Sequence, residues 1–378
     1  MVVLHLLFYS LWQPNAMTGD IKIFNEDWMT ALVQIETGSV QCCVTSPPYW
    51  GLRDYGMEGQ LGLEKTPEEY IRKLVEGFSL LRNALAENGV LWLNLGDSYV
   101  SGKGRYSSIE QTISGKNRGE PIEDNIPDLR NHEYLKNKDL AMIPARVAIA
   151  LQRDGWWLRS EIVWNKPNPM PESVKDRPTK SHEMIYLLTK NARYYYDAEA
   201  IYEPANYDGR KDTIFKGSLK YDQDTLHRVG GERWPKKMKN LEPHGQQPNT
   251  MHKRRAQGLP DIKYPARNKR DVWSINTECY REMHFATFPE EIPRLCIAAG
   301  SKEGQIILDP FAGSGTTGDV ALRMKRRFIG IELNSTYVNT LIEPRLNNID
   351  PLFRGNAQNR YANNPHGLNK TKNYGRNN

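Results

Sequence analysis

The sequence has few cysteines and no long apolar run. Its 378 residues contain four cysteines, the adjacent pair Cys42 and Cys43 and the isolated Cys279 and Cys296, which form neither a disulfide framework nor a Cys-x-x-Cys metal pair. The longest apolar stretch, residues 2–9, is shorter than the roughly 20 residues that a membrane helix needs and lacks the basic start of a signal peptide. We therefore expect an intracellular protein, in the cytoplasm or nucleoid, with no membrane association and no bound metal.

Acidic residues are scarce in two parts of the chain. The net charge is only +6, but residues 204–270 carry 16 Lys and Arg against 7 Asp and Glu, and residues 351–378 carry eight Asn, five Lys and Arg, and no acidic residue. Clustered Lys and Arg favour a polyanionic partner such as nucleic acid, because these side chains neutralise phosphates. A solvated loop is the alternative interpretation of the same charges.

Strand-like and helix-like runs alternate on both sides of the basic segment. Strands are expected at residues 21–24, 40–45, 90–95, 157–164, 184–189, 306–308 and 328–331. Helices are expected at residues 30–35, 67–88, 143–153, 289–300 and 336–346, with another ending at 324. This alternation predicts an α/β fold with a doubly wound, mostly parallel sheet and helices on both faces.

The first candidate site is a glycine-rich turn between an expected strand and an expected helix. The sequence DPFAGSGTTG, residues 309–318, offers backbone N–H groups and a helix N-terminus to a ligand. Gly313, Gly315 and Gly318 match GxGxxG, and Glu332 follows Gly313 by 19 residues, at the strand end where a ribose-binding acid belongs. The turn favours a nucleoside cofactor and by itself leaves both NAD and S-adenosylmethionine open.

The second candidate site is a proline turn that follows the expected strand 40–45. Ser46, Pro47, Pro48 and Tyr49 come at the carboxyl edge of the sheet, where open α/β folds place ligands. The prolines fix the backbone and remove two N–H donors, which leaves carbonyls to accept hydrogen bonds. The Ser46 hydroxyl and the Pro47 carbonyl suit the two hydrogens of an exocyclic amino group, and the Tyr49 ring suits base stacking. Taken alone, these residues also fit a surface turn with an exposed aromatic side chain.

Both turns resemble motifs of one enzyme family. DPFAGSGTTG followed by IGIEL is similar to the cofactor motif, and TSPPYWGLRDYG to the catalytic motif, of amino-methylating DNA methyltransferases that use S-adenosylmethionine. The catalytic motif comes first, as in the β group of the family, with the target-recognition region between the two motifs. The resemblance covers about residues 20–346 and implies the class I methyltransferase fold, Rossmann-like and doubly wound, with a polar, basic target-recognition insertion.

The resemblance also implies how the chain is divided and what it binds. The expected parts are an unstructured or upstream extension (1–16), a catalytic half (17–200) with a polar insertion (101–131), a target-recognition region (201–270), a cofactor-binding half (271–350) and a basic, Asn-rich tail (351–378). The implied partner is double-stranded DNA, and a companion restriction endonuclease is a further candidate. Monomer and dimer are both left open.

The resemblance assigns roles to particular residues. The implied catalytic residues are Ser46, Pro47, Pro48 and Tyr49. The implied S-adenosylmethionine-binding residues are Asp27, Thr45, His284, Phe285, Thr287, Pro289, Asp309, Pro310, Phe311, Gly313, Ser314, Gly315, Thr316, Thr317 and Glu332. Contacts to the target base or to phosphate, weighed against ordinary caps and polar loops, are considered for Asn94, Asp97, Lys166, Arg177 and His182.

The first residue of the catalytic motif bears on the target base. Serine is usual there in N4-cytosine members, and Asp or Asn in N6-adenine members, so Ser46 favours N4 of cytosine over N6 of adenine. Direct methyl transfer to a flipped-out base is expected, and the chain has no Pro-Cys dipeptide of the kind that carbon-5 methylation uses. An NAD-dependent oxidoreductase and a non-enzymatic nucleic-acid binder are the alternatives, and RNA stays open as a substrate.

Overall fold

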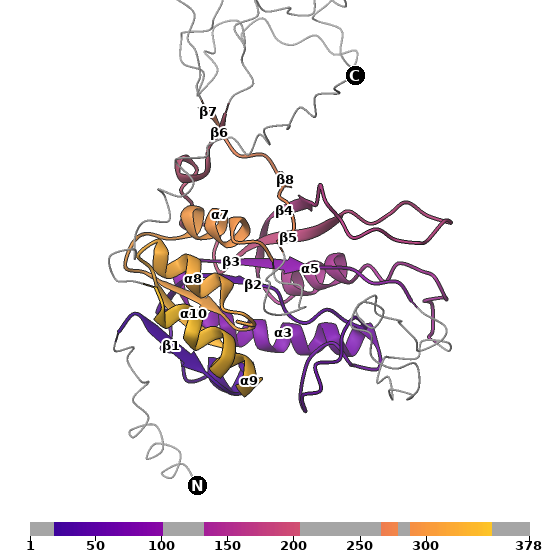
Figure 1. Cartoon of the computed structure of the whole chain (residues 1–378), viewed down its shortest axis with the longest axis horizontal. Helices are drawn as coiled ribbons and strands as arrows, with labels where there is room; N and C mark the ends of the chain where they lie inside the picture. The colour runs from indigo at the N-terminus through magenta and orange to yellow at the C-terminus, as the bar shows by residue number, and fades with distance from the viewer. Residues whose placement is uncertain (1–18, 101–131, 205–265, 279–287, 350–378) are drawn as a thin grey trace, which may run out of the picture. The chain divides into compact units, whose positions relative to one another are not determined.

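The chain divides into two compact units. The computed structural model describes residues 19–100, 132–204, 266–278 and 288–349 (Figure 1). The first unit comprises Met1–Ile201 and Arg270–Asn378, and the second Tyr202–Lys269. The predictions made for residues 1–16, 101–131 and 351–378 lie outside the described residues.

An eight-stranded sheet forms the centre of the first unit. Its strands, in spatial order, are β1 (Ile21–Phe24), β10 (Arg327–Ile331), β9 (Ile306–Asp309), β2 (Val40–Thr45), β3 (Leu85–Leu95), β5 (His182–Thr189), β4 (Trp157–Asn165) and β8 (Val272–Ser274). Neighbouring strands are parallel, except that β5 runs antiparallel to both β3 and β4. The predicted α/β fold with a mostly parallel sheet is confirmed.

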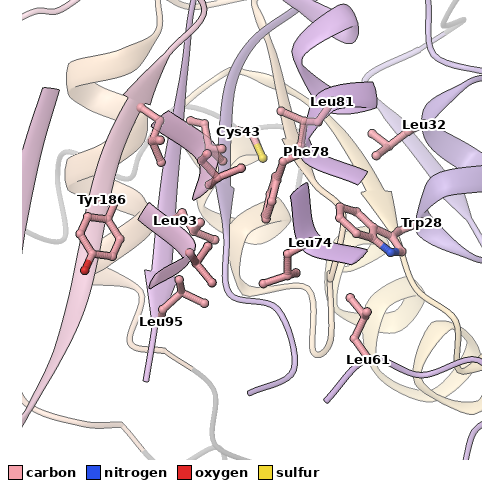
Figure 2. Close-up of a cluster of buried hydrophobic side chains, with 14 of the residues drawn as sticks. Trp28, Leu32, Cys43, Leu61, Leu74, Phe78, Leu81, Leu93, Leu95 and Tyr186 are labelled. Carbon is pink, nitrogen blue, oxygen red and sulfur yellow. The ribbon is translucent and has the colours of Figure 1, made fainter. Parts of the chain in front are cut away.

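Helices cover both faces of this sheet, because side chains that alternate along a strand belong to two different hydrophobic clusters. In β2, Cys43 belongs to one cluster and Cys42 and Val44 to the other. The first cluster includes residues of α2 (Trp28–Leu32), α3 (Pro67–Ala84) and α5 (Ile143–Arg153), and part of it is drawn in Figure 2. The second includes residues of α7 (Glu291–Gly300), α8 (Thr316–Arg323) and α10 (Glu343–Asn347). The cysteines Cys42, Cys43 and Cys296 are buried free thiols.

The start of α3 follows the sequence, whereas its end does not. Thr66 caps the helix by accepting a hydrogen bond from the Glu69 N–H at 3.2 Å, and Pro67 occupies the first turn, as predicted. The predicted continuation of the helix to residue 88 is wrong, because α3 ends at Ala84. Leu85 adopts an extended conformation, begins β3 and pairs with Val40 of β2, so its side chain is buried in the sheet rather than on a helix face.

The segment expected to form a last helix at 336–346 is divided into three. It consists of α9 (Ser335–Tyr337), a π-helical turn, η4 (Val338–Ile342), and α10. Pro344 lies at the start of α10 and has no N–H to donate to the carbonyl four residues earlier, which is consistent with the wider turn that precedes it. No helix among the described residues is long and apolar enough to cross a membrane.

The connections of the sheet diverge between β9 and β2. The chain leaves β9 through α8 to reach β10 on one side, and leaves β2 through α3 to reach β3 on the other. In open α/β sheets, the crevice at the carboxyl ends of two such strands is where ligands bind. Both turns singled out in the sequence begin at this crevice, since one follows Thr45 and the other includes Asp309.

In the second unit, the structure describes a short antiparallel pair of strands. β6 (Glu203–Pro204) pairs with β7 (Ala266–Arg267), and Arg267 Nε lies 2.8 Å from Glu203 Oε1. The rest of the region predicted to recognise the target, 201–270, lies largely outside the described residues. Its predicted role in reading DNA stays a prediction.

Candidate active site

A hydrogen bond between buried side chains joins the two turns. Thr45 Oγ1 donates to Asp309 Oδ1 at 2.7 Å, although the two residues are 264 positions apart in the chain. Thr317 Oγ1 donates to the other oxygen, Asp309 Oδ2, also at 2.7 Å. Burial raises the pKa of Asp309 to about 6, against the effect of these two hydroxyls and the Phe311 N–H, which lower it. The carboxyl ends of β2 and β9 are therefore fastened to each other.

A cleft of about 1860 Å³ lies over this edge of the sheet. The predicted site residues in its wall are Asp27, Ser46, Pro47, Pro48, Tyr49, Asp309, Pro310, Phe311, Gly313, Ser314, Thr316 and Glu332. Thr45, Pro289, Gly315 and Thr317 are outside this wall, and of these Thr45 and Thr317 contact Asp309. His284, Phe285 and Thr287 lie outside the described residues.

The glycine turn forms one side of the cleft with its backbone. Gly313 and Gly315 have φ angles of 55° and 77°, in the left-handed region that favours glycine. The Gly313 N–H donates to Glu332 Oε2 at 2.9 Å, and the Asn334 N–H donates to Glu332 Oε1 at 2.9 Å. Burial raises the pKa of Glu332, and these backbone donors oppose that rise. The carboxylate is thus held in the cleft wall by the turn beside it.

An arginine from the last helix supports the same turn. Arg345 donates to the Ser314 carbonyl at 3.3 Å and to Thr316 Oγ1 at 3.1 Å. Its other side pairs with Glu290 at 3.1 Å and with Asp319 at 3.0 Å. The sequence reasoning missed Arg345, because a basic residue in a C-terminal helix carries no signal of a contact to a turn about 30 residues away.

Two residues of the N-terminal segment complete this side of the cleft. Asp27 caps α2, since its Oδ1 accepts from the Met29 N–H at 2.9 Å and the Thr30 N–H at 3.2 Å. The ring of Trp28 packs against Phe311, with centroids 4.8 Å apart. Asp27 and Phe311 both line the cleft, so a carboxylate and an aromatic ring lie on the glycine-turn side.

These groups fit the nucleoside part of S-adenosylmethionine. An added side-chain carbon at Gly313 would have only the Phe311 carbonyl within 4 Å, so the space beside the turn is open to a ligand. A carboxylate such as Glu332 accepts hydrogen bonds from ribose hydroxyls, which is the role that an acid at this strand end has in nucleotide-binding folds.

The proline turn forms the other side of the cleft with side chains. Tyr49 OH donates to Glu183 Oε2 at 2.7 Å and lies 3.1 Å from Ser46 Oγ. Asn94 Nδ2 lies 2.9 Å from Tyr49 OH, 2.9 Å from Glu183 Oε2 and 3.4 Å from Ser46 Oγ. All four side chains line the cleft, so Ser46 belongs to a polar network formed by the turn after β2 and by β3 and β5.

A partly buried ion pair sets the charge of this network. Glu183 pairs with Lys166, which follows β4. Burial alone would raise the pKa of Glu183, but the charge and hydrogen bond of Lys166, together with the hydrogen bonds from Tyr49 and Asn94, hold it below the usual value. Burial and the neighbouring Glu183 raise the pKa of Tyr49 well above its usual value. The network therefore contains an ionised carboxylate beside a neutral phenol.

The proline turn is also fixed from two sides by its neighbours. Tyr70 OH, from α3, donates to the Pro48 carbonyl at 2.8 Å, so this carbonyl is already used within the protein. A side-chain carbon added at Gly96 would lie 2.4 Å from Tyr49 Cε2. The Tyr49 ring can occupy its position because residue 96 has no side chain.

The remaining residues weighed in the sequence have mixed outcomes. Asp97 Oδ1 accepts from the Ser98 N–H at 2.9 Å and from the Ile143 N–H, at the start of α5, at 3.0 Å. Arg177 pairs with Glu172 at 2.6 Å. All five residues, Asn94, Asp97, Lys166, Arg177 and His182, line the cleft, and Asn94 and Lys166 contact Glu183.

Sequence reasoning missed Glu183 itself. The residue stands before an apolar run, SHEMIYLLT, where a charged residue suggests a solvent-exposed strand start. Because β5 is antiparallel to its neighbours, its first residues lie at the carboxyl edge of the parallel strands. The only signal in the sequence is that Glu183 and Lys166 lie at the ends of two neighbouring expected strands. Predicting that they meet requires knowing that these strands run in opposite directions.

Comparisons with known proteins agree with this geometry. The sequence profile of the N6 and N4 methyltransferases, described as DNA methylase, matches residues 40–343. The chain is 41% identical over 330 residues to Type II methyltransferase M.Cfr9I of Citrobacter freundii, with 87% of this chain and 89% of that protein covered. It is 42% identical over 318 residues to Type II methyltransferase M.SmaI of Serratia marcescens, with 84% and 88% covered.

A solved structure shows the same fold. The PvuII DNA methyltransferase, named as cytosine-N4-specific, superposes with a TM-score of 0.51 at 15% sequence identity. The match covers 93% of this chain and 95% of that one. At this identity the likeness concerns the arrangement of the sheet and helices.

Proposed function

This chain belongs to the DNA methylase family of N6 and N4 methyltransferases, and we propose that it transfers a methyl group from S-adenosylmethionine to the N4 amino group of cytosine in double-stranded DNA. The observation that carries the proposal is the Thr45–Asp309 hydrogen bond of 2.7 Å. It fastens the proline turn to the glycine turn, so that Ser46 and Gly313 line one cleft. A cofactor held by one turn can then face an amino group held by the other.

The glycine-turn side of the cleft is the proposed cofactor site. Gly313, Phe311, Asp27 and Glu332 would hold S-adenosylmethionine there. Bound in this site, the cofactor supplies a methyl group attached to a positively charged sulfur. Family membership supports this cofactor over NAD, which the glycine spacing alone left open.

The proline-turn side is the proposed site of the target amine. An exocyclic amino group is a poor nucleophile because its lone pair is delocalised into the ring. The Ser46 hydroxyl and the Pro47 carbonyl accept its two hydrogens, which favours a pyramidal nitrogen with a localised lone pair. Fixed alignment of that lone pair lowers the remaining barrier. Tyr49 lines the same cleft and offers a ring to the base, which must first leave the duplex at a cost of a few kcal/mol.

Two features support the choice of cytosine and of DNA. Ser46 occupies the position where N4-cytosine members usually have serine. The 16 Lys and Arg of residues 204–270 supply charge for phosphate contacts, and we propose that this segment selects the target sequence. The relatives are named Type II methyltransferases, which supports a companion restriction endonuclease that the methyl group would block.

Nucleoside analysis tests the proposal. Duplex DNA is incubated with the purified chain and S-adenosylmethionine carrying a heavy methyl group, digested to nucleosides and examined by mass spectrometry. The expected product is labelled N4-methylcytosine. Labelled N6-methyladenine without N4-methylcytosine would mean that the target base is adenine. If the protein binds the cofactor but no labelled nucleoside forms, DNA methylation is rejected. Sequencing the methylated positions then gives the recognition sequence.

A further inference from the structure

The polar network around Ser46 has a defined order of donors and acceptors. Glu183 lies against Lys166, and a carboxylate in such an ion pair only accepts hydrogen bonds. Tyr49 OH lies 2.7 Å from Glu183 Oε2. The phenol has a single hydrogen, so that hydrogen is donated to Glu183.

The direction of the next hydrogen bond follows from the first. With its hydrogen committed to Glu183, the Tyr49 oxygen can only accept, and it lies 3.1 Å from Ser46 Oγ and 2.9 Å from Asn94 Nδ2. The single hydrogen of Ser46 is therefore donated to Tyr49. What Ser46 Oγ has left for the cleft is a lone pair.

The neighbouring Asn94 follows the same order of donors and acceptors. Asn94 lines the cleft and is 4% exposed, and its Oδ1 has no hydrogen-bond partner in the described part of the chain. Its Nδ2 is occupied by Tyr49 and Glu183. The amide orientation is thus also fixed by Glu183, with the oxygen left over.

We propose that Glu183 is a positioning residue which, through Tyr49, holds Ser46 as a hydrogen-bond acceptor toward the substrate and so selects a base with an amino group. The inference rests on the proposed function and adds to it the residue that sets the polarity of the site. An amino group donates to Ser46 Oγ. A carbonyl oxygen in the same place, as in uracil, faces another acceptor and forms no hydrogen bond. Removing that carbonyl from water costs as much free energy as removing the amino group, and no hydrogen bond offsets the cost.

Two conservative substitutions separate this role from simple packing. Glu183→Gln keeps the size of the side chain, but its Nε2 can donate to Tyr49. Tyr49 can then donate to Ser46, whose hydrogen turns into the cleft. Glu183→Asp shortens the side chain by one carbon but still only accepts, so the order of donors is preserved.

The first experiment compares both variants with the wild type in single-turnover methylation of a duplex that contains the recognition sequence. Loss of a hydrogen bond worth about 1.5–3 kcal/mol predicts a rate decrease on the order of 10- to 100-fold for Glu183→Gln, with Glu183→Asp the less affected. Packing alone predicts the reverse order, since glutamine fills the site and aspartate leaves a gap. The proposal is overturned if the rate of Glu183→Gln is within threefold of the wild-type rate, or if Glu183→Asp is slower than Glu183→Gln. Thermal unfolding temperatures confirm that both variants are folded.

The second experiment measures binding rather than turnover. Affinities for two duplexes, with cytosine or uracil at the target position, are measured in the presence of S-adenosylhomocysteine. The same two duplexes are used for each protein, so the cost of opening each duplex cancels between proteins. The preference for cytosine over uracil is expected to fall about tenfold in Glu183→Gln, because one hydrogen bond changes direction. An unchanged preference overturns the proposal even if the wild type methylates no DNA, which keeps this failure distinct from that of the proposed function.

The third experiment tests whether Glu183 acts through Tyr49. Tyr49→Phe removes the hydroxyl and leaves the ring, which disconnects Glu183 from Ser46. In that background, Glu183→Gln is expected to cause no further decrease in rate. The same fold decrease in both backgrounds would mean that Glu183 acts independently of Tyr49 and would overturn the proposal.

Discussion

The two turns at the edge of the sheet build a site in opposite ways. The glycine turn presents backbone groups, with Gly313 in a left-handed conformation and its N–H on Glu332. The proline turn presents side chains, with Ser46 bound into a network that reaches Glu183. A backbone site depends on local conformation, so its sequence pattern is short and continuous. A side-chain site depends on partners from other strands, so only part of it is visible in any one stretch of sequence.

The largest expected effect comes from a substitution in the proline turn alone. Ser46→Ala removes the proposed acceptor for the target amine, and we expect the methylation rate to fall on the order of a thousandfold, as when an electrostatic contact to a transition state is deleted. Affinities for S-adenosylhomocysteine and duplex DNA should stay within a few fold of wild type. The exposed Ser335 provides a matched control as Ser335→Ala. A Ser46→Ala enzyme with near wild-type rate would remove Ser46 from the reaction.

The next effect concerns Asp309, the residue of the glycine turn that is hydrogen-bonded to Thr45. Its folded pKa of about 6 lies above the usual 3.8, so its stabilising contribution is full below about pH 4 and is lost as the pH rises through 6. The loss amounts to up to about 3 kcal/mol, from roughly two pK units at 1.36 kcal/mol each. Asp309→Asn does not ionise, so its unfolding free energy relative to wild type should rise between pH 4.5 and 7.5. Denaturant titrations at both pH values measure this, and a difference that does not change with pH would contradict the buried ionisation.

A smaller effect is expected when the contact that supports the glycine turn is removed. Glu332→Ala removes the carboxylate that the Gly313 and Asn334 N–H groups hold in the cleft. We expect the calorimetric Kd for S-adenosylhomocysteine to rise about 10- to 100-fold, the loss of a hydrogen bond to a charged group. The methylation rate at saturating cofactor should change much less. An unchanged Kd would place the cofactor away from Glu332.

The smallest effect is expected from a substitution next to the proline turn. In Gly96→Ala, the new carbon would lie 2.4 Å from Tyr49 Cε2, so the ring must move. A shift of the network is expected to lower the rate roughly tenfold, about 1.4 kcal/mol, with cofactor affinity unchanged. Gly304→Ala is the control for a glycine substitution that strains the backbone away from the cleft, because Gly304 has a φ of 77° and does not line the cleft. Equal rates for Gly96→Ala and wild type would show that the ring position is not critical.

Much of the fold followed from local sequence, and the exceptions have physical reasons. Val40–Thr45 and Ile143–Arg153 begin and end where periodicity placed them. The end of α3 did not, because Leu85 is as well buried in a strand as on a helix and its pairing with Val40 is a long-range interaction. Turn chemistry at Thr66 and Pro67 is local, and there the sequence prediction is confirmed.

The site was predictable where it depends on strand ends and not where it depends on strand direction. Parallel strands bring their carboxyl ends to one edge, so placing Ser46 and Gly313 near each other needed only the order of strands and helices. Glu183 joins them because β5 runs the other way, and the length of chain between strands does not reveal that. Arg345 reaches the glycine turn through tertiary packing of α10, which no local pattern encodes.

The most direct test of the central claim is a crystal structure of the chain with S-adenosylhomocysteine and a duplex that contains its recognition sequence. The account predicts the sulfur in the cleft between the glycine turn and Ser46, with the amino group of an extruded cytosine within hydrogen-bonding distance of Ser46 Oγ. A cofactor bound outside this cleft, or a sulfur that faces away from Ser46, would contradict it.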